Sequence, residues 1–108
     1  MATTDHEFTK QADAFMSEVL EALDELDPDD LDCTLAMGVL TMEFDDGTKC
    51  IMNRQTAAHQ IWLAYGATAW HFEFDPAQGQ WLDTKGRGPI RSVLAETIGQ
   101  KLGQDITL

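Results

Sequence analysis

The sequence of 108 residues is poor in positive charge, in cysteine and in long apolar runs. Only 7 Lys and Arg stand against 19 Asp and Glu, a formal net charge of −12, and nucleic acid and anionic membrane surfaces both repel such a chain. Two cysteines favour reduced thiols in the cytoplasm over a disulfide framework. No apolar run approaches the roughly 18 residues of a membrane span. These absences predict a small, acidic, cytoplasmic protein whose main partner is neither nucleic acid nor a membrane.

Motifs of catalysis and of tight metal binding are also missing. The sequence contains no GxSxG, GxxxxGK[ST] or GxGxxG, and its histidines and cysteines show no CxxC, HxxxH or HExxH spacing. We therefore expect neither an enzyme nor a zinc protein. Cys33 and Cys50 are expected within strands, as small and partly buried side chains rather than nucleophiles.

Hydrophobic periodicity predicts a helix at each end of the chain. An apolar stripe of helical period runs from about Asp5 to Leu26, with Thr4 as its N-cap, and Pro28 cannot continue it. A second stripe follows Pro89, which suits the first turn of a helix, and stops at Gly103.

Alternating apolar and polar residues predict short strands between these helices. The expected strands span residues 32–36, 39–44, 48–54, 60–65, 69–75 and 80–83. Asp46-Gly47 predicts a type I′ hairpin turn, and Lys85–Pro89 is expected to be a mobile loop. Short connections imply an antiparallel sheet, and two helices with one apolar stripe each can cover one of its faces. The predicted fold is α+β, a two-layer α/β sandwich forming a single domain over residues 1–108, with the other sheet face open.

The negative charge is concentrated in the first part of the chain. Residues 1–46 hold 14 of the 19 acids and one base, a balance of −13, whereas residues 47–108 hold five acids and six bases, a balance of +1. On the predicted helix, Glu18, Glu21 and Glu25 share the face opposite the apolar stripe. The candidate metal ligands are Glu18, Glu21, Asp24, Glu25, Asp27, Asp29 and Asp32.

This placement of acids breaks two local rules of helix stability. Like charges four residues apart, as at Glu21 and Glu25, cost about 0.2–0.5 kcal/mol, and acids in a last helical turn cost about 0.3–1 kcal/mol each. Such a departure indicates function. Clustered carboxylates supply hard oxygen ligands for cations such as iron, manganese or calcium, and they also attract basic protein surfaces. Without His or Cys ligands or an EF-hand, we expect any metal to be weakly held; a merely solvated acidic face is the alternative.

Trp62 is a candidate interface residue on the open sheet face. If Ile61, Leu63 and Tyr65 point toward the helices, Trp62 points away from them, near Asn53–Gln55. An exposed Trp among polar residues is typical of a protein interface. The alternative is that a neighbouring side chain or loop covers it.

Several motifs resemble those of the bacterial frataxin (CyaY) family, over nearly the whole chain. They are the acidic first helix, Leu31-Asp32-Cys33, Gly38-Val39-Leu40-Thr41, Asn53-Arg54-Gln55, His59-Gln60-Ile61-Trp62-Leu63-Ala64, Trp70-His71-Phe72 and the C-terminal amphipathic helix. The Asn-Arg-Gln and His-Gln-x-Trp-Leu-Ala pair is highly specific. The resemblance implies an α–β sandwich that binds iron (Fe²⁺ or Fe³⁺) weakly through the first helix and the edge of the first strand. It also implies binding to the cysteine desulfurase and scaffold protein that build iron–sulfur clusters, and modulation of their rate.

Carried over by position, the resemblance gives both kinds of site residue. The iron ligands would be Glu21, Asp24, Glu25, Asp27, Asp29 and Asp32, and the partner-binding residues would be Asn53, Gln55 and Trp62. The chain departs from the family at Leu20, where an acid is expected, while Glu18 adds an acid nearby; Pro28 stands in a shortened turn.

Two other functions stay open at this point. One is an iron store with ferroxidase activity, which usually needs a Glu-x-x-His oxidation centre that the sequence lacks. The other is an acidic interaction domain with no metal role. Strong net charge favours a monomer, although iron could bridge acidic faces into oligomers.

Overall fold

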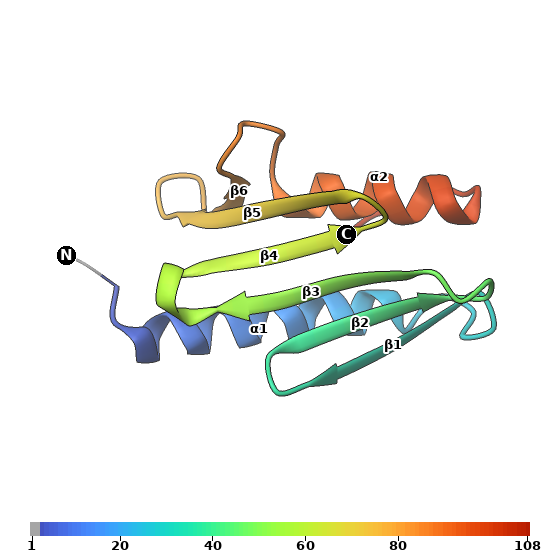
Figure 1. The fold of residues 1–108 in the computed structure, drawn as a ribbon, viewed down its shortest axis with the longest axis horizontal. Helices are drawn as coiled ribbons and strands as arrows, with labels where there is room; N and C mark the ends of the chain where they lie inside the picture. Colours follow the sequence, from blue (N-terminus) through green and yellow to red (C-terminus); the bar gives the residue numbers. More distant parts are fainter. Residues whose placement is uncertain (1–2) are drawn as a thin grey trace.

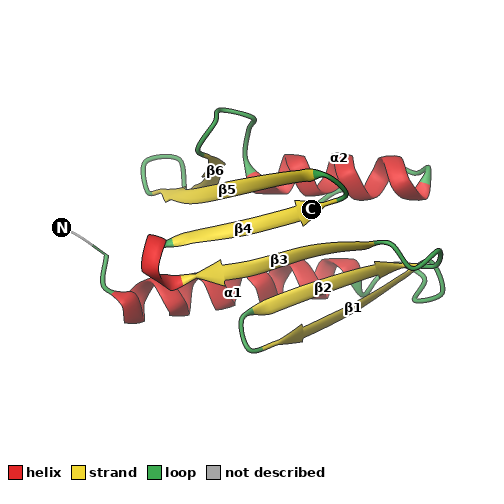
Figure 2. Ribbon diagram, in the orientation of Figure 1, coloured by secondary structure: helices red, strands yellow, loops and turns green. Residues whose placement is uncertain are grey.

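A computed structural model describes residues 3–108 as two packed layers (Figure 1). The elements in chain order are α1 (Asp5–Leu23), β1 (Leu31–Ala36), β2 (Val39–Phe44), β3 (Lys49–Gln55), η1 (Thr56–Ala58), β4 (Gln60–Tyr65), β5 (Thr68–Asp75), β6 (Gln80–Asp83) and α2 (Ile90–Leu102). The strands form one antiparallel sheet in sequence order, and both helices pack on it (Figure 2). The predicted two-layer α+β fold is confirmed; the first two residues of the expected 1–108 domain lie outside the described chain.

The first helix begins where the sequence predicts and ends earlier. Thr4 Oγ1 accepts a hydrogen bond from the backbone N–H of Glu7 at 3.1 Å, so Thr4 is the N-cap. The helix stops at Leu23, three residues before the predicted end at Leu26, and Asp24 is its C-cap. Its last turn contains no base, so the carboxylates there face the negative end of the helix dipole and disfavour further turns. Neither helix within residues 3–108 combines the length and apolar character needed to cross a membrane.

The hairpin turns differ from prediction in one respect. Met37 and Gly38 connect β1 to β2 with φ angles of 52° and 77°, and positive values at both positions define a type I′ turn. The type I′ turn predicted at Asp46 is wrong, because only Gly47 has a positive φ there, 86°. The Asp46 carboxylate accepts the N–H of Thr48 at 3.0 Å and stabilises a longer loop instead.

The loop before α2 is fastened by an ion pair whose carboxylate is buried. Asp83 accepts from Arg87 Nε at 2.8 Å, and its side chain is fully buried. Arg87 also donates to the carbonyl oxygen of Ala69 at 2.9 Å and lies 5.5 Å above the ring of Trp70. The segment predicted to be a mobile loop is therefore anchored on β5. Pro89 is the N-cap of α2 rather than part of its first turn.

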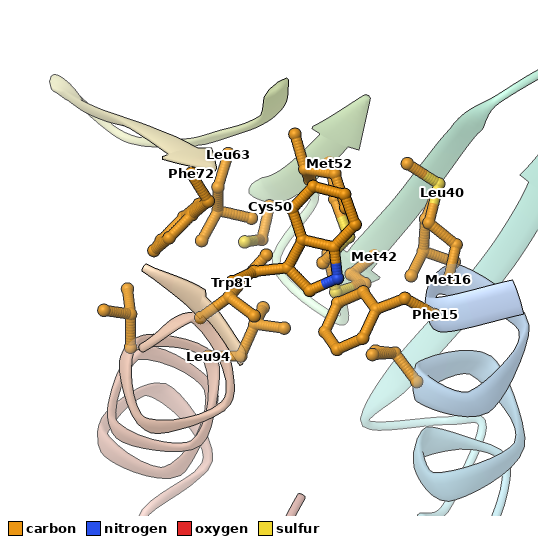
Figure 3. Close-up of a cluster of buried hydrophobic side chains, with 14 of the residues drawn as sticks. Phe15, Met16, Leu40, Met42, Cys50, Met52, Leu63, Phe72, Trp81 and Leu94 are labelled. Carbon is orange, nitrogen blue, oxygen red and sulfur yellow. The ribbon is translucent and has the colours of Figure 1, made fainter. Parts of the chain in front are cut away.

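The core lies between the sheet and the two helices. Trp81 of β6 stands between Phe15 of α1 and Leu94 of α2 (Figure 3). Its ring packs edge-on against that of Phe8, with centroids 5.9 Å apart. The apolar stripes predicted on both helices form one side of this core. The other side is formed by the strands, each of which turns alternate side chains toward the helices.

The chain after α2 folds back on that helix. Ile106 and Leu108 are partly buried against the core. Residues 104–106 pass so close to Gly99 that a Cβ built there would be 2.8 Å from the carbonyl oxygen of Gln104. Gly99 therefore makes room for the returning chain. Gly103, in the left-handed conformation with φ 69°, ends α2 as predicted, and the chain turns back there.

Candidate functional site: an acidic ridge and an open sheet face

Exposed carboxylates gather where α1 ends and β1 begins. The buried stripe of α1 faces the core and turns its acids outward, and the turn that follows carries further acids into β1. We call this surface the acidic ridge; it consists of Glu21, Asp24, Glu25, Asp27, Asp29, Asp30 and Asp32, all exposed. Six of these seven were predicted as metal ligands. The seventh, Asp30, is not among the predicted ligands, although the sequence places it in the same acidic turn.

The turn within the acidic ridge is held by Asp27. Its carboxylate accepts the backbone N–H of Asp29 at 2.9 Å, and its carbonyl oxygen accepts those of Asp30 and Leu31 at 2.9 and 3.1 Å. These bonds fix the backbone of the turn and leave the neighbouring carboxylates in solvent. Asp27 is thus partly committed to shaping the ridge.

Glu18, predicted as a metal ligand with Glu21 and Glu25, is exposed as they are but differs from them in having a basic partner. Its Oε2 accepts a hydrogen bond at 2.7 Å from Arg91 of α2, which also lies 5.0 Å above the ring of Phe15. Glu18 therefore bridges the two helices. None of the seven ridge carboxylates forms an ion pair with a base in the described chain.

The ridge carboxylates do not converge on a point. Across residues 3–108, no three or more His, Cys, Asp or Glu side chains are grouped so that they could hold a metal ion. Hard oxygen donors suit iron, but these side chains are exposed and would have to move together around the ion. A cation bound here would keep much of its water, so binding would be weak and exchangeable.

The two cysteines offer no alternative metal site. In the sheet register, Met42 of β2 lies between Cys33 of β1 and Cys50 of β3. The two cysteine Cα atoms are therefore about 10 Å apart, beyond the roughly 7 Å limit for a disulfide. Burial raises the pKa of the Cys50 thiol to about 12. Burial, with the charges of Asp24 and Asp32, raises that of Cys33 to about 11. Both thiols stay protonated at neutral pH without a metal, and their placement in strands, partly or fully buried, agrees with the sequence prediction.

Trp62 lies on the open sheet face, as predicted, in the row Asn53–Trp62–His71. Its indole stacks on the His71 ring, with centroids 4.3 Å apart and planes at 11°. Its Nε1 donates to Gln60 Oε1 at 2.8 Å, and Gln60 Nε2 donates to Glu73 Oε2 at 2.9 Å. The alternative, that a neighbour covers Trp62, is also partly true, because His71 covers one side of the ring. These contacts hold Trp62 in one orientation.

We call the residues around Trp62 the sheet patch: Asn53, Gln55, Trp62 and His71. Gln55 pairs with Gln60 and shares the face of Trp62. Asp32 of the acidic ridge is on the same open face, four residues along β1 and three strands away from Trp62, a separation of roughly 20 Å. One large partner could therefore contact both surfaces.

Fold and surface together define a small two-layer α/β protein with an acidic surface suited to cations or basic proteins. The chain belongs to the frataxin-like family, whose domain model matches residues 1–104. It is 38% identical over 105 residues to the iron-sulfur cluster assembly protein CyaY of Thioalkalivibrio sulfidiphilus, covering 96% of this chain and 98% of that protein. Its identity to CyaY of Tolumonas auensis is 33% over 104 residues, covering 96% and 97%. The resemblance inferred from the sequence is confirmed.

Two solved structures share the fold. Frataxin from Psychromonas ingrahamii superposes with a TM-score of 0.88 at 28% identity, covering 97% of both chains. Trimeric frataxin from Saccharomyces cerevisiae, in complex with ferrous iron, superposes with a TM-score of 0.74 at 25% identity, covering 96% of this chain and 90% of that one.

Proposed function

We propose that this protein is an iron-responsive regulator and iron-donor adaptor of iron–sulfur cluster assembly. It docks on the cysteine desulfurase and its scaffold protein through the acidic ridge and the sheet patch. The observation that carries the proposal is the ridge itself, seven exposed carboxylates without a paired base. Such a surface attracts a basic partner. The assembly role in the names of the bacterial relatives supports this choice of partner.

Iron is cargo in this proposal rather than a resident cofactor. Exposed oxygen donors that must gather around the ion favour weak, reversible binding. Support comes from the ferrous complex of the yeast relative. The ion would neutralise part of the ridge and so change its attraction for a basic surface. A cytoplasmic location and a monomeric state without iron belong to the same proposal, because a net charge of −12 opposes self-association.

The test is sulfide production by the cognate cysteine desulfurase with its scaffold, while this protein is titrated in with and without ferrous iron. A rate change that depends on iron supports the proposal. A change that ignores iron favours metal-independent docking, the second candidate, which is consistent with ridge carboxylates that do not converge. No rate change at all would contradict both.

A pair of charge variants identifies the docking surface. Glu21→Lys with Asp24→Lys reverses two ridge charges and should weaken binding about tenfold. Glu96→Lys with Asp105→Lys makes the same change in net charge on exposed residues outside the ridge and should have a much smaller effect. Raised salt should weaken binding of the wild type. Equal affinity of both variants, together with indifference to salt, excludes the ridge as the docking surface.

A further inference from the structure

The two edge strands of the sheet, β1 and β6, differ in whether another part of the chain covers them. At β6, the chain covers its own edge, because Leu82 bridges Pro89 and the N–H of Asp83 donates to the carbonyl oxygen of Gly88 at 3.0 Å. At the other margin, β1 pairs only with β2, and no ribbon lies beyond it in Figure 1. Within residues 3–108, β1 is thus the open edge.

The turn geometry fixes which backbone groups of β1 point outward. A two-residue type I′ turn makes Ala36 and Val39 a hydrogen-bonded pair. Bonding then alternates along the strand, so Thr34 bonds to β2, whereas the N–H and C=O groups of Cys33 and Leu35 point away from it. Neither residue forms a backbone bond elsewhere in the described chain. These donors and acceptors have the spacing that a further strand requires.

Among the residues that the structure describes, negative charge is the only protection of this edge. Native edge strands are usually blunted by Lys, Pro or a bulge, but β1 has no Lys or Pro, and its register with β2 runs unbroken from Leu31 to Ala36. Asp32 is exposed beside the edge, and Asp24 lies near enough for its charge to act on Cys33. A second copy of this acidic chain is repelled there, whereas a basic chain is attracted.

We propose that β1 accepts an extended basic segment of a protein partner as an added strand. The inference rests on the proposed function, because it specifies how a basic partner engages the acidic ridge. Apolar side chains of the segment would lie beside the half-buried Cys33 and Leu35, and its Lys or Arg side chains would lie beside Asp32 on the open face. Backbone bonds then supply affinity, and the ridge selects for positive charge.

The direct probe is an acetylated peptide of about six residues in which lysine and valine alternate, matched to the length of β1. A control peptide has the same sequence, with methyl groups on the alternate amide nitrogens that would face β1. It keeps the charge but has no N–H groups to donate to β1. Fluorescence anisotropy at low salt should show the unmodified peptide binding at least about tenfold more tightly. Hydrogen exchange followed by NMR should show the amides of Cys33 and Leu35 becoming protected only with the unmodified peptide.

A protein variant tests the same edge from the other side. Leu35→Pro removes an N–H that points to solvent and leaves every hydrogen bond to β2 in place. Edge strands tolerate proline at such positions. The variant should abolish the difference between the two peptides. Should this variant fail to fold, the comparison of the two peptides on the wild-type protein still decides the question.

The outcomes separate this inference from the proposed function. Equal affinity of both peptides, or unprotected Cys33 and Leu35 amides, overturns strand addition, since charge alone then explains binding. Ridge-dependent binding of the desulfurase complex without binding of either peptide also overturns it and leaves the proposed function intact. If neither the peptides nor the desulfurase complex binds, both the strand addition and the proposed function are rejected.

Discussion

The guanidinium group of Arg54 occupies the space that a side chain at position 38 would need. A Cβ built on Gly38 would lie 2.8 Å from Arg54 Cζ and 3.0 Å from its Nε. Arg54 also forms an ion pair with Asp13 of α1, and its backbone N–H donates to the Gly38 carbonyl oxygen at 3.0 Å. The middle residue of the Asn-Arg-Gln motif therefore ties the β1–β2 turn to α1, while its neighbours face the open side of the sheet.

Replacing Gly38 by alanine should destabilise the protein by about 2–3 kcal/mol, because backbone strain at φ 77° adds to the clash with Arg54. Gly47→Ala is the matched control. Its φ is 86°, but nothing lies within 4 Å of the added Cβ, so it should cost only about 1 kcal/mol. Urea unfolding followed by circular dichroism measures both. Equal losses would mean that Arg54 moves aside freely.

The effect of Gly99→Ala on stability should depend on whether residues 104–108, which fold back on α2, are present. In the whole protein the added Cβ meets the Gln104 carbonyl oxygen and should destabilise by about 1 kcal/mol or more. In a variant without residues 104–108, the same change should stabilise by about 0.5–1 kcal/mol through helix propensity. Thermal unfolding of the four proteins gives the comparison. Stabilisation in both backgrounds would contradict the packing of the returning chain on α2.

Neutralising the ridge should stabilise the fold. Glu21→Gln with Asp24→Asn removes charges that repel one another and oppose the dipole of α1, a gain of about 0.5–1.5 kcal/mol at low salt. The gain should shrink in 1 M salt, where the Debye length falls to about 3 Å. Chemical unfolding at the two ionic strengths is the measurement. A loss of stability would indicate a structural role for these acids.

Substitution of Trp62 and of Trp70, on the adjacent strands β4 and β5, should separate an effect on docking from an effect on stability. Trp62→Ala removes a residue of the sheet patch and should weaken binding to the desulfurase–scaffold complex about tenfold, with at most about 1 kcal/mol lost in stability. Trp70 packs against the core and under Arg87, so Trp70→Ala should cost about 2 kcal/mol and leave binding of the folded protein unchanged. Calorimetric titration and urea unfolding of both variants test this. The reverse pattern would exclude the sheet patch from docking.

Asp83 should contribute to the acid sensitivity of the protein. Its hydrogen bonds with Arg87 lower the pKa of this carboxyl below its ordinary value. A lowered folded-state pKa means that this stability is present above the unfolded-state value, about 4, and is lost as the pH falls through the folded-state pKa. Asp83→Asn should therefore reduce stability at pH 7 and flatten its decline below pH 4. Urea unfolding from pH 7 to pH 3 checks the slope, and parallel curves would refute the assignment.

The sequence predicts most of the fold because strong turn signals bound its alternating segments. Strands β2, β4 and β6 begin and end as predicted, since a turn containing Gly interrupts the apolar pattern at one end or both ends of each. Contacts between distant residues were not predictable. Arg54 and Asp13 are 41 residues apart, and Arg91 and Glu18 are 73 apart. Local spacing carries no information on such pairs, and for that reason the pairing of Glu18 with Arg91 cannot be seen in the sequence.

The distribution of ion pairs also makes the charge of the molecule uneven. Arg54, Arg87 and Arg91, and Lys101 beside Asp46, are each paired with an acid outside the ridge. The seven ridge acids have no such partner within residues 3–108, so a large share of the net negative charge lies where α1 meets β1. Such an uneven charge acts as a dipole, so the field of a basic surface would turn the protein ridge-first before contact. This rotation speeds association and fades once the Debye length falls well below about 8 Å, its physiological value, while the lifetime of the bound complex changes little.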